Sequence, residues 1–171
     1  MKDEFILNEI WFLTISGAFQ RANVYVEGIN DNEKTEFKNQ LKEFVTNIAL
    51  QYKNDVNESE HLKNIQNILN EFSSYPKVKL NYGISQKVLN LYLKYLWCLE
   101  KIVTPPHFPV DRIIQEKLKM GTNIKAWTKM ENDEHYNTVI NLAKDMIKDN
   151  TNYNKIAELE LELFAGKEIR K

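Results

Sequence analysis

Two side chains, Lys87 and Asp111, have the types and positions that amine-based catalysis requires. Lys87 follows the turn "NYGIS" and stands just inside a long apolar helix predicted over residues 85–101. Gly83 can take the positive φ of such a turn, and Ser85 is a good N-cap. The positive end of a helix dipole disfavours an ammonium, so the pKa of Lys87 is predicted to fall, and a neutral amine is a nucleophile. The alternative is an ordinary surface lysine at a helix start.

Asp111 ends the loop "TPPHFPV" and begins the next predicted helix, residues 111–119, which is expected to end at Gly121. An N-cap is the simplest role for an aspartate there. The same position favours an ionised carboxylate, which can stabilise a developing cation. The two roles are compatible, and a catalytic role requires Lys87 and Asp111 to lie side by side at the mouth of a positively charged cleft.

The residues around this pair form a pattern that spans positions 79–114. Gly83, Ile84, Ser85, Gln86 and Lys87 match a hairpin of the form G-x-G-x-K, with Ser85 in place of the second glycine, and "PVD" (109–111) matches a loop that follows an apolar helix. In these motifs the chain resembles the helix–hairpin–helix DNA glycosylase superfamily, which includes endonuclease III-like and oxidised-guanine glycosylases. The iron–sulfur cysteines of some members are absent, since Cys98 is the only cysteine.

The resemblance implies that Lys87 attacks the anomeric carbon of the sugar and forms a Schiff base. It implies that Asp111 stabilises the oxocarbenium-like state or assists the lysine, and that the target base is flipped out of the duplex. No metal or organic cofactor is needed for that chemistry. The residues predicted to contact DNA are Gly83, Ile84, Ser85, Gln86, Lys79, Arg112 and His107, and the candidates for base stacking are Tyr82 and Trp127. For His107 the alternative is packing against a Tyr or Trp ring.

The charge of the chain is uneven, although the formal net charge is only −1. Residues 77–129 carry ten basic and three acidic side chains, a balance of +7, which leaves −8 for the remainder. A locally basic surface suits a DNA backbone, because neutralising phosphates and releasing their counterions supplies much of the affinity. The alternative is a solvated basic face without a partner.

Helical periodicity dominates the chain and predicts a compact all-α, multi-helix domain with a helix–hairpin–helix element around the central apolar helix, residues 85–101. The first helix should bury Ile10, Phe12, Leu13, Ile15 and Phe19, and Cys98 should be a core residue. Besides the central helix, helices are predicted over residues 8–22, 32–53, 57–72, 111–119, 132–148 and 154–164. A short extended piece, "NVYVEG", is expected after the helix at 8–22. The alternation in "ELELELF" would also suit a strand. We expect one domain, residues 1–171, with two lobes, 1–75 and 76–171, as the alternative.

The remaining features limit the functional classes. A lone cysteine and no apolar run long enough for a signal sequence or membrane span predict a soluble, cytoplasmic protein, and abundant Asn and Lys indicate a bacterial or phage genome. No metal, phosphate-loop or dinucleotide motif is present. The leading hypothesis is therefore a DNA base-excision glycosylase, with lyase activity through the lysine. The alternatives are a non-catalytic helical DNA-binding module and a partner-binding helical protein of phage or toxin–antitoxin type; the target base and the oligomeric state stay open.

Overall fold

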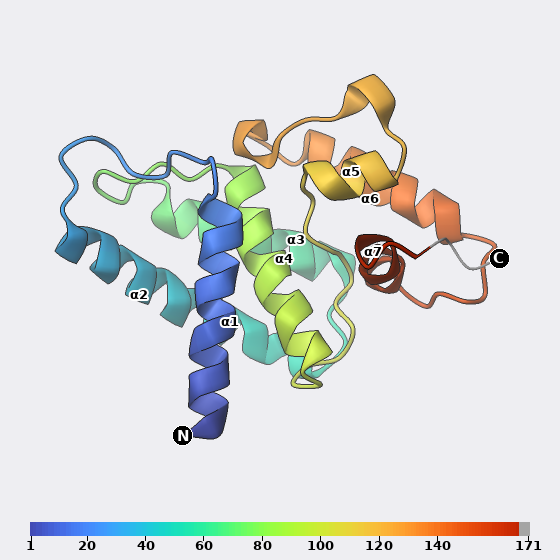
Figure 1. Ribbon diagram of the computed structural model, residues 1–171, viewed down its shortest axis with the longest axis horizontal. Coiled ribbons are helices and arrows are strands. Elements are labelled where there is room, and N and C mark those ends of the chain that lie inside the picture. The colour runs from blue at the N-terminus through green and yellow to red at the C-terminus, as the bar shows by residue number, and fades with distance from the viewer. Residues whose placement is uncertain (168–171) are drawn as a thin grey trace.

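The chain folds into helices connected by short irregular segments (Figure 1). The structure is a computed structural model that describes residues 1–167 of the 171. Seven α-helices and no strand occur among the described residues, so the predicted all-α class is confirmed. The elements are α1 (Lys2–Phe19), α2 (Asp31–Ala49), η1 (Leu50–Lys53), α3 (Glu58–Phe72), α4 (Tyr82–Cys98), α5 (Arg112–Lys117), η2 (Gly121–Asn123), η3 (Trp127–Lys129), α6 (Glu134–Ile147) and α7 (Ile156–Phe164).

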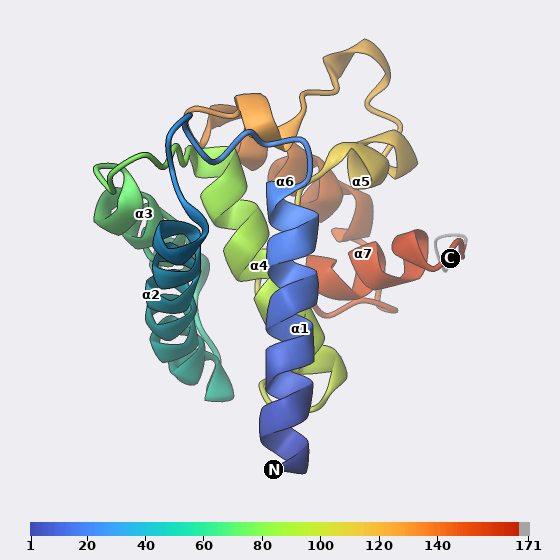
Figure 2. The ribbon, with the colours of Figure 1, turned by 60° about the vertical axis from the view of Figure 1, so that its left-hand side comes forward.

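Helix α4 is the centre of the fold, as its apolar sequence predicted. It packs against α1, α3 and η3. Helices α2 and α3 lie on one side of it and α5, α6 and α7 on the other, while α1 runs alongside (Figures 1 and 2). Every residue from Tyr82 to Asn90 is buried, polar ones included. The N-terminal half of α4 therefore passes through the core rather than along the surface.

The start of α4 differs from the prediction. The helix begins at Tyr82, and its N-cap is Asn81, whose side chain accepts a hydrogen bond from the Ile84 amide at 2.9 Å. Ser85 is not the cap, because its hydroxyl lies inside the helix and donates to the Asn81 carbonyl at 3.0 Å. The predicted glycine turn is thus the first turn of the helix itself.

Gly83 is required for close packing rather than for a positive φ. Its amide donates to the Met130 carbonyl at 2.9 Å. A Cβ added at Gly83 would stand 1.9 Å from the Trp127 carbonyl oxygen, far inside van der Waals contact. Only glycine lets the segment around η3 lie directly on the first turn of α4.

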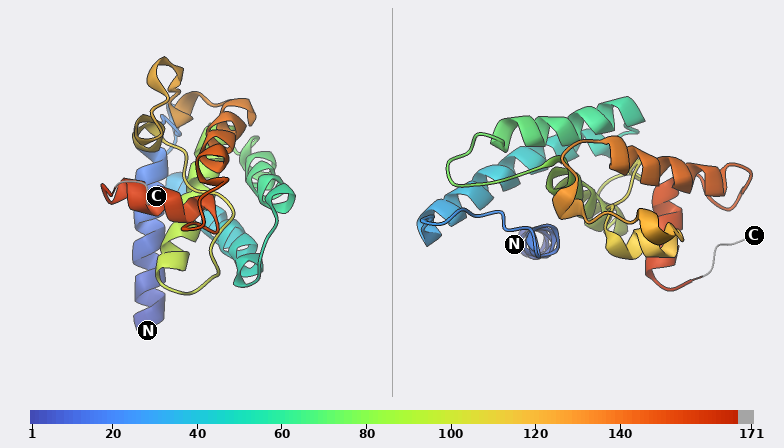
Figure 3. Two further views of the ribbon diagram at one scale, coloured as in Figure 1. Left: turned by 90° about the vertical axis from the view of Figure 1, so that its right-hand side faces the viewer. Right: turned by 90° about the horizontal axis from the view of Figure 1, so that it is seen from above.

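Helix α1 buries a different face from the one predicted. Ile10, Trp11, Thr14 and Ala18 are buried, whereas Phe12 and Leu13 are 67% and 48% exposed. The predicted inward positions Phe12 and Leu13 were wrong because apolar residues occur all round this helix, so periodicity does not define one face. The first turns of α1 also extend past the neighbouring helices (Figure 3). Cys98, predicted to be buried, is exposed at the last residue of α4.

The remaining elements follow their sequence signals more closely. The extended piece forms one antiparallel bridge, between Tyr25 and Val78, instead of a sheet. The segment "ELELELF" belongs to α7, which packs on α5 and α6. Asp111 is the N-cap of α5, as predicted, although α5 ends at Lys117. Within residues 1–167, no helix has the length and apolar character needed to cross a membrane.

Candidate lysine–aspartate site

Lys87 and Asp111 lie together, as a catalytic role requires, but they are largely buried beneath Trp127 and do not stand at an open cleft mouth. Lys87 Nζ is 3.5 Å from Asp111 Oδ2, an ion pair whose side chains are 6% and 17% exposed. Because α4 begins at Tyr82, Lys87 stands in the second turn of the helix, not the first. The two residues are brought together by α4 and by the loop that returns to α5.

Trp127 completes the surroundings of the amine. Lys87 Nζ stands 3.4 Å from the centroid of the Trp127 ring. The indole nitrogen of Trp127 donates to the Ala18 carbonyl at 3.0 Å, which fixes the ring against α1. A cation over a desolvated indole face is stabilised by about 2 kcal/mol. The ammonium of Lys87 is thus held by a carboxylate on one side and an aromatic face on another.

Burial lowers the pKa of Lys87, and the neighbouring Asp111 carboxylate opposes that shift without cancelling it. Burial acts this way because a low-dielectric environment penalises the charged form of an amine. The predicted direction is confirmed, but its physical cause is burial and not the helix dipole. A lowered pKa enlarges the fraction of neutral, nucleophilic amine near neutral pH.

Asp111 serves two contacts at once. One carboxylate oxygen accepts the Ile114 amide at 3.1 Å and caps α5, while the other faces Lys87. The position of Asp111 is set in part by Gln86, which neighbours Lys87 in sequence. The Gln86 side chain donates to the Val110 carbonyl at 2.8 Å and accepts from the Val110 amide at 3.1 Å. This two-bond clamp joins the loop to α4 one residue before Asp111.

A second buried ion pair, which sequence reasoning missed, joins α4 to α7. Lys94 Nζ is 2.8 Å from Glu160 Oε1, with side chains 12% and 4% exposed. Lys94 is seven residues after Lys87, so both lysines lie on the same side of the helix. Burial raises the pKa of Glu160, and Lys94 opposes that rise. The alternation around Glu160 could be assigned to a strand or a helix, which hid the inward position of this carboxylate.

The predicted hairpin contacts lie inside the protein. Ile84, Ser85 and Gln86 are buried along with Gly83, and their polar groups are engaged within the fold. Contact of these four residues with a DNA phosphate stays a prediction, and it requires α4 to become accessible at its first turns. Lys79 and Arg112 are exposed, and Arg112 pairs with Glu116 at 2.7 Å.

The aromatic and histidine candidates are also packed. His107 is buried and its Nδ1 lies 2.9 Å from the Tyr136 hydroxyl, in line with the packing alternative. Tyr82 is a helix residue rather than a connector residue, and its ring packs against Tyr136 with centroids 5.7 Å apart. Trp127 is buried with its ring facing Lys87. None of the three presents a free ring face for a base in this conformation.

The basic segment is partly neutralised within the fold. Five of its ten basic residues pair with carboxylates among the described residues, namely Lys77 with Glu33, Lys87 with Asp111, Lys94 with Glu160, Lys101 with Asp3, and Arg112 with Glu116. The excess positive charge that remains for a partner is therefore smaller than the count of +7 implies.

Residues 1–167 contain no group of three or more His, Cys, Asp or Glu side chains placed to hold a metal ion. Comparison of the chain with protein-family models, with curated proteins and with solved structures gives no match.

Proposed function

We propose that the protein is a DNA glycosylase with lyase activity, in which Lys87 is the nucleophile and Asp111 assists it. The observation that carries the proposal is the buried Lys87 amine, 3.5 Å from a carboxylate and with a lowered pKa. In these surroundings the lysine amine can be neutral near pH 7 while the Asp111 carboxylate remains beside it. The glycosylases that the chain resembles use a lysine and an aspartate in these roles. The proposed substrate is DNA with a damaged or modified base.

In the proposed reaction, the Lys87 nitrogen bonds to the anomeric carbon while the glycosidic bond breaks. The departing base leaves with the bonding electrons and takes up a proton, and Asp111 stabilises the positive charge that develops on the sugar. The bonded nitrogen then gives up one proton, and the ring oxygen takes up a proton as its bond to the anomeric carbon breaks. The ring opens, and a protonated imine joins Lys87 to the sugar. Elimination of the 3′ phosphate from that imine would cleave the strand.

Substrate access requires Trp127 to move. The indole covers the Lys87 amine at 3.4 Å, so a sugar carbon can reach Nζ only after the ring leaves that face. The indole is held by its hydrogen bond to Ala18, and the backbone carbonyl of Trp127 is held by its close approach to Gly83. In the proposed mechanism the displaced indole lies beside the extruded nucleotide, which agrees with the stacking role expected of Trp127.

Borohydride trapping tests the proposal. The full chain is incubated with duplex DNA that carries an abasic site or an oxidised base, and the imine is reduced to a stable adduct. We expect an adduct with the wild type, none with Lys87→Gln, and slower formation with Asp111→Asn. Lys148→Gln, which changes an exposed lysine directly after α6, is the matched control.

A non-catalytic helical DNA-binding module is the second candidate, and the packing of Trp127 on Lys87 favours it. In that case Lys87 and Asp111 are a structural ion pair. Fluorescence anisotropy at low salt, where electrostatic affinity is greatest, would detect DNA binding by both wild type and Lys87→Gln, with no adduct from either. If neither binding nor adduct is found, both candidates are wrong and the protein's partner is not DNA.

A further inference from the structure

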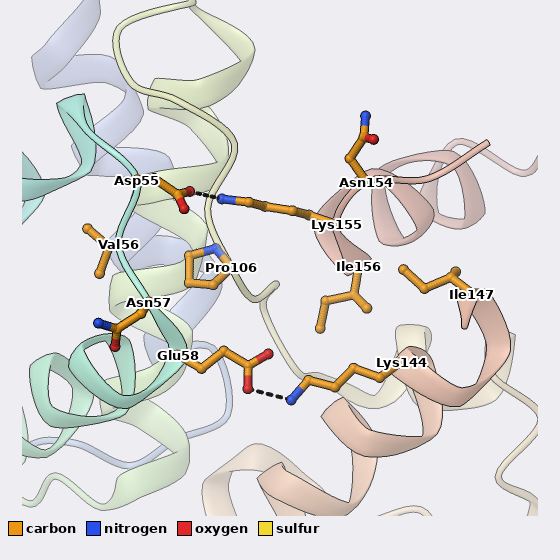
Figure 4. A pocket seen from close by; sticks show the side chains of 10 residues that line it. All are labelled: Asp55, Val56, Asn57, Glu58, Pro106, Lys144, Ile147, Asn154, Lys155 and Ile156. Atoms are coloured by element: carbon orange, nitrogen blue, oxygen red, sulfur yellow. Dashed lines mark hydrogen bonds and ion pairs between the residues drawn. The ribbon is translucent and has the colours of Figure 1, made fainter. Parts of the chain in front are cut away.

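A charged cleft lies apart from the Lys87–Asp111 pair and shares no residue with it (Figure 4). It encloses about 350 Å³ between the start of α3, the loop at Pro106, α6 and the start of α7. The residues that line it are Asp55, Val56, Asn57, Glu58, Pro106, Lys144, Ile147, Asn154, Lys155 and Ile156.

The two walls of this cleft carry opposite charges. Asp55 and Glu58 stand on the wall formed by the start of α3, and Lys144 and Lys155 stand on the facing wall, as Figure 4 shows. Glu58 Oε2 is 2.6 Å from Lys144 Nζ, and Asp55 forms the second ion pair with Lys155. Each wall therefore carries two charges of one sign, and opposite charges meet across the cleft.

Between the two ion pairs the lining is apolar. Pro106 and Ile156 lie between the pairs in Figure 4, with Val56 and Ile147 further out on either side. An apolar group placed there would be removed from water without burying any of the four charges. The cleft thus combines a separated positive and negative wall with an apolar middle.

A buried histidine stands behind the acidic wall. Among residues 1–167, no group forms a hydrogen bond with His107 Nε2, which lies 3.9 Å from Glu58 Oε1, the oxygen that Lys144 does not contact. A shift of the Glu58 carboxylate by about 1 Å would bring this contact to hydrogen-bonding distance. Buried polar atoms without a partner are uncommon in folded proteins, and this one lies next to a carboxylate of the acidic wall.

We propose that this cleft binds a small zwitterion with an apolar body, such as a free apolar α-amino acid. Its ammonium would lie between Asp55 and Glu58, and its carboxylate between Lys144 and Lys155. A ligand with a single charge would compete with one member of each existing ion pair. A zwitterion instead offers each wall a charge of the opposite sign, so both existing ion pairs can be kept.

Isothermal titration of the full chain with a matched set of ligands tests this. The set is L-leucine, isocaproate, which lacks the ammonium, and isoamylamine, which lacks the carboxylate; all three have the same branched body. We expect L-leucine to bind about tenfold more tightly than either analogue, because each charge-assisted contact contributes about that factor. Equal affinity for isocaproate or isoamylamine, or no binding of L-leucine at millimolar concentration, would show that the proposal is wrong.

Two variants locate the binding. Glu58→Gln and Lys144→Met each remove one charge from one wall, at side chains that are partly exposed, so far-UV circular dichroism should confirm a retained fold. Each is expected to weaken L-leucine binding about tenfold. Lys148→Met, four residues further along the chain and outside the cleft, should leave the affinity unchanged. Unchanged affinity in both cleft variants would mean that L-leucine binds elsewhere and would overturn the proposal.

Discussion

At the scale of single residues, Lys87 is held in the core by two stabilising contacts and one penalty. Burial disfavours its charge, while the Asp111 carboxylate and the Trp127 ring favour it. Removing either partner of a buried ion pair leaves the other charge without its counter-charge, and the cost is larger where that charge is more buried and has fewer other polar contacts. The two halves of this pair should therefore respond differently to substitution.

We predict that Asp111→Asn lowers the free energy of unfolding by about 3 kcal/mol, whereas Lys87→Met lowers it by less than about 1 kcal/mol. Asparagine retains the N-cap of α5 but leaves the ammonium of Lys87 without a counter-charge. Methionine leaves Asp111 with its Ile114 amide and partial exposure to water. Urea denaturation at pH 7 measures both values, and a larger loss in Lys87→Met would contradict this account.

Gly83 gives a second prediction at this scale. Gly83→Ala would place a Cβ 1.9 Å from a backbone oxygen, so we expect a loss of about 3 kcal/mol, despite the better helix propensity of alanine. Gly17→Ala in α1 is the control, since its Cβ would meet only the end of the Leu91 side chain, at 3.0 Å. Thermal denaturation should show a large loss for the first and a change within about 1 kcal/mol for the second. Similar melting temperatures for the two variants would mean that the η3 segment is not tightly held on α4.

At the scale of elements, α1 is a surface helix with apolar side chains on both faces. Trp11 packs edge-on against Tyr92 of α4, with ring centroids 5.7 Å apart, while its sequence neighbour Phe12 faces outward. Phe5, Ile6 and Leu13 are exposed on the same helix. Trp11 and Phe12 are therefore expected to contribute unequally to the stability of the fold, although they are adjacent in sequence.

We predict that Trp11→Ala destabilises the protein by about 3–5 kcal/mol, whereas Phe12→Ala costs less than about 0.5 kcal/mol. The first change leaves a cavity between α1 and α4, and the second removes a ring that is already in water. Guanidinium unfolding followed by circular dichroism at several protein concentrations measures both. A large, concentration-dependent loss in Phe12→Ala would mean instead that the outer face of α1 is covered in solution.

At the scale of the whole molecule, a buried polar network joins distant segments. His61 of α3 lies against His107 of the proline loop, with ring centroids 4.8 Å apart, and His107 contacts Tyr136 of α6. The Tyr52 hydroxyl is 2.7 Å from His61 Nδ1. Burial lowers the pKa of His61 well below its usual value, and burial, together with nearby Lys144, lowers the pKa of His107 to about 3.

This network predicts that the protein loses stability in mild acid. Both histidines are neutral in the folded state but take up a proton in the unfolded state below about pH 6.5. The unfolded state therefore binds more protons, and the free energy of unfolding falls as the pH decreases from about 6.5, by up to about 1.4 kcal/mol per pH unit for each histidine. Denaturation between pH 7 and pH 5 measures the slope.

His107→Gln should make that slope shallower by about one proton, since glutamine does not titrate and its amide can still bond to the Tyr136 hydroxyl. His61 would then supply most of the remaining dependence. An unchanged slope in His107→Gln would mean that His107 is already accessible to protons in the folded state.

The sequence by itself determined the all-α class, the central position of α4 and the capping role of Asp111. These follow from local signals, namely helical periodicity, cap residues and a proline loop. The contact of Asp111 with Lys87 was expected from the family resemblance, and the tertiary structure forms it. Tertiary structure alone decided which face of α1 is buried, why residue 83 is glycine, and that Trp127 covers the amine. It also decided the Lys94–Glu160 pair and the charged cleft at Glu58 and Lys144. Each of these depends on contacts between segments far apart in the chain, and side-chain spacing carries no information about which distant surface a residue will meet.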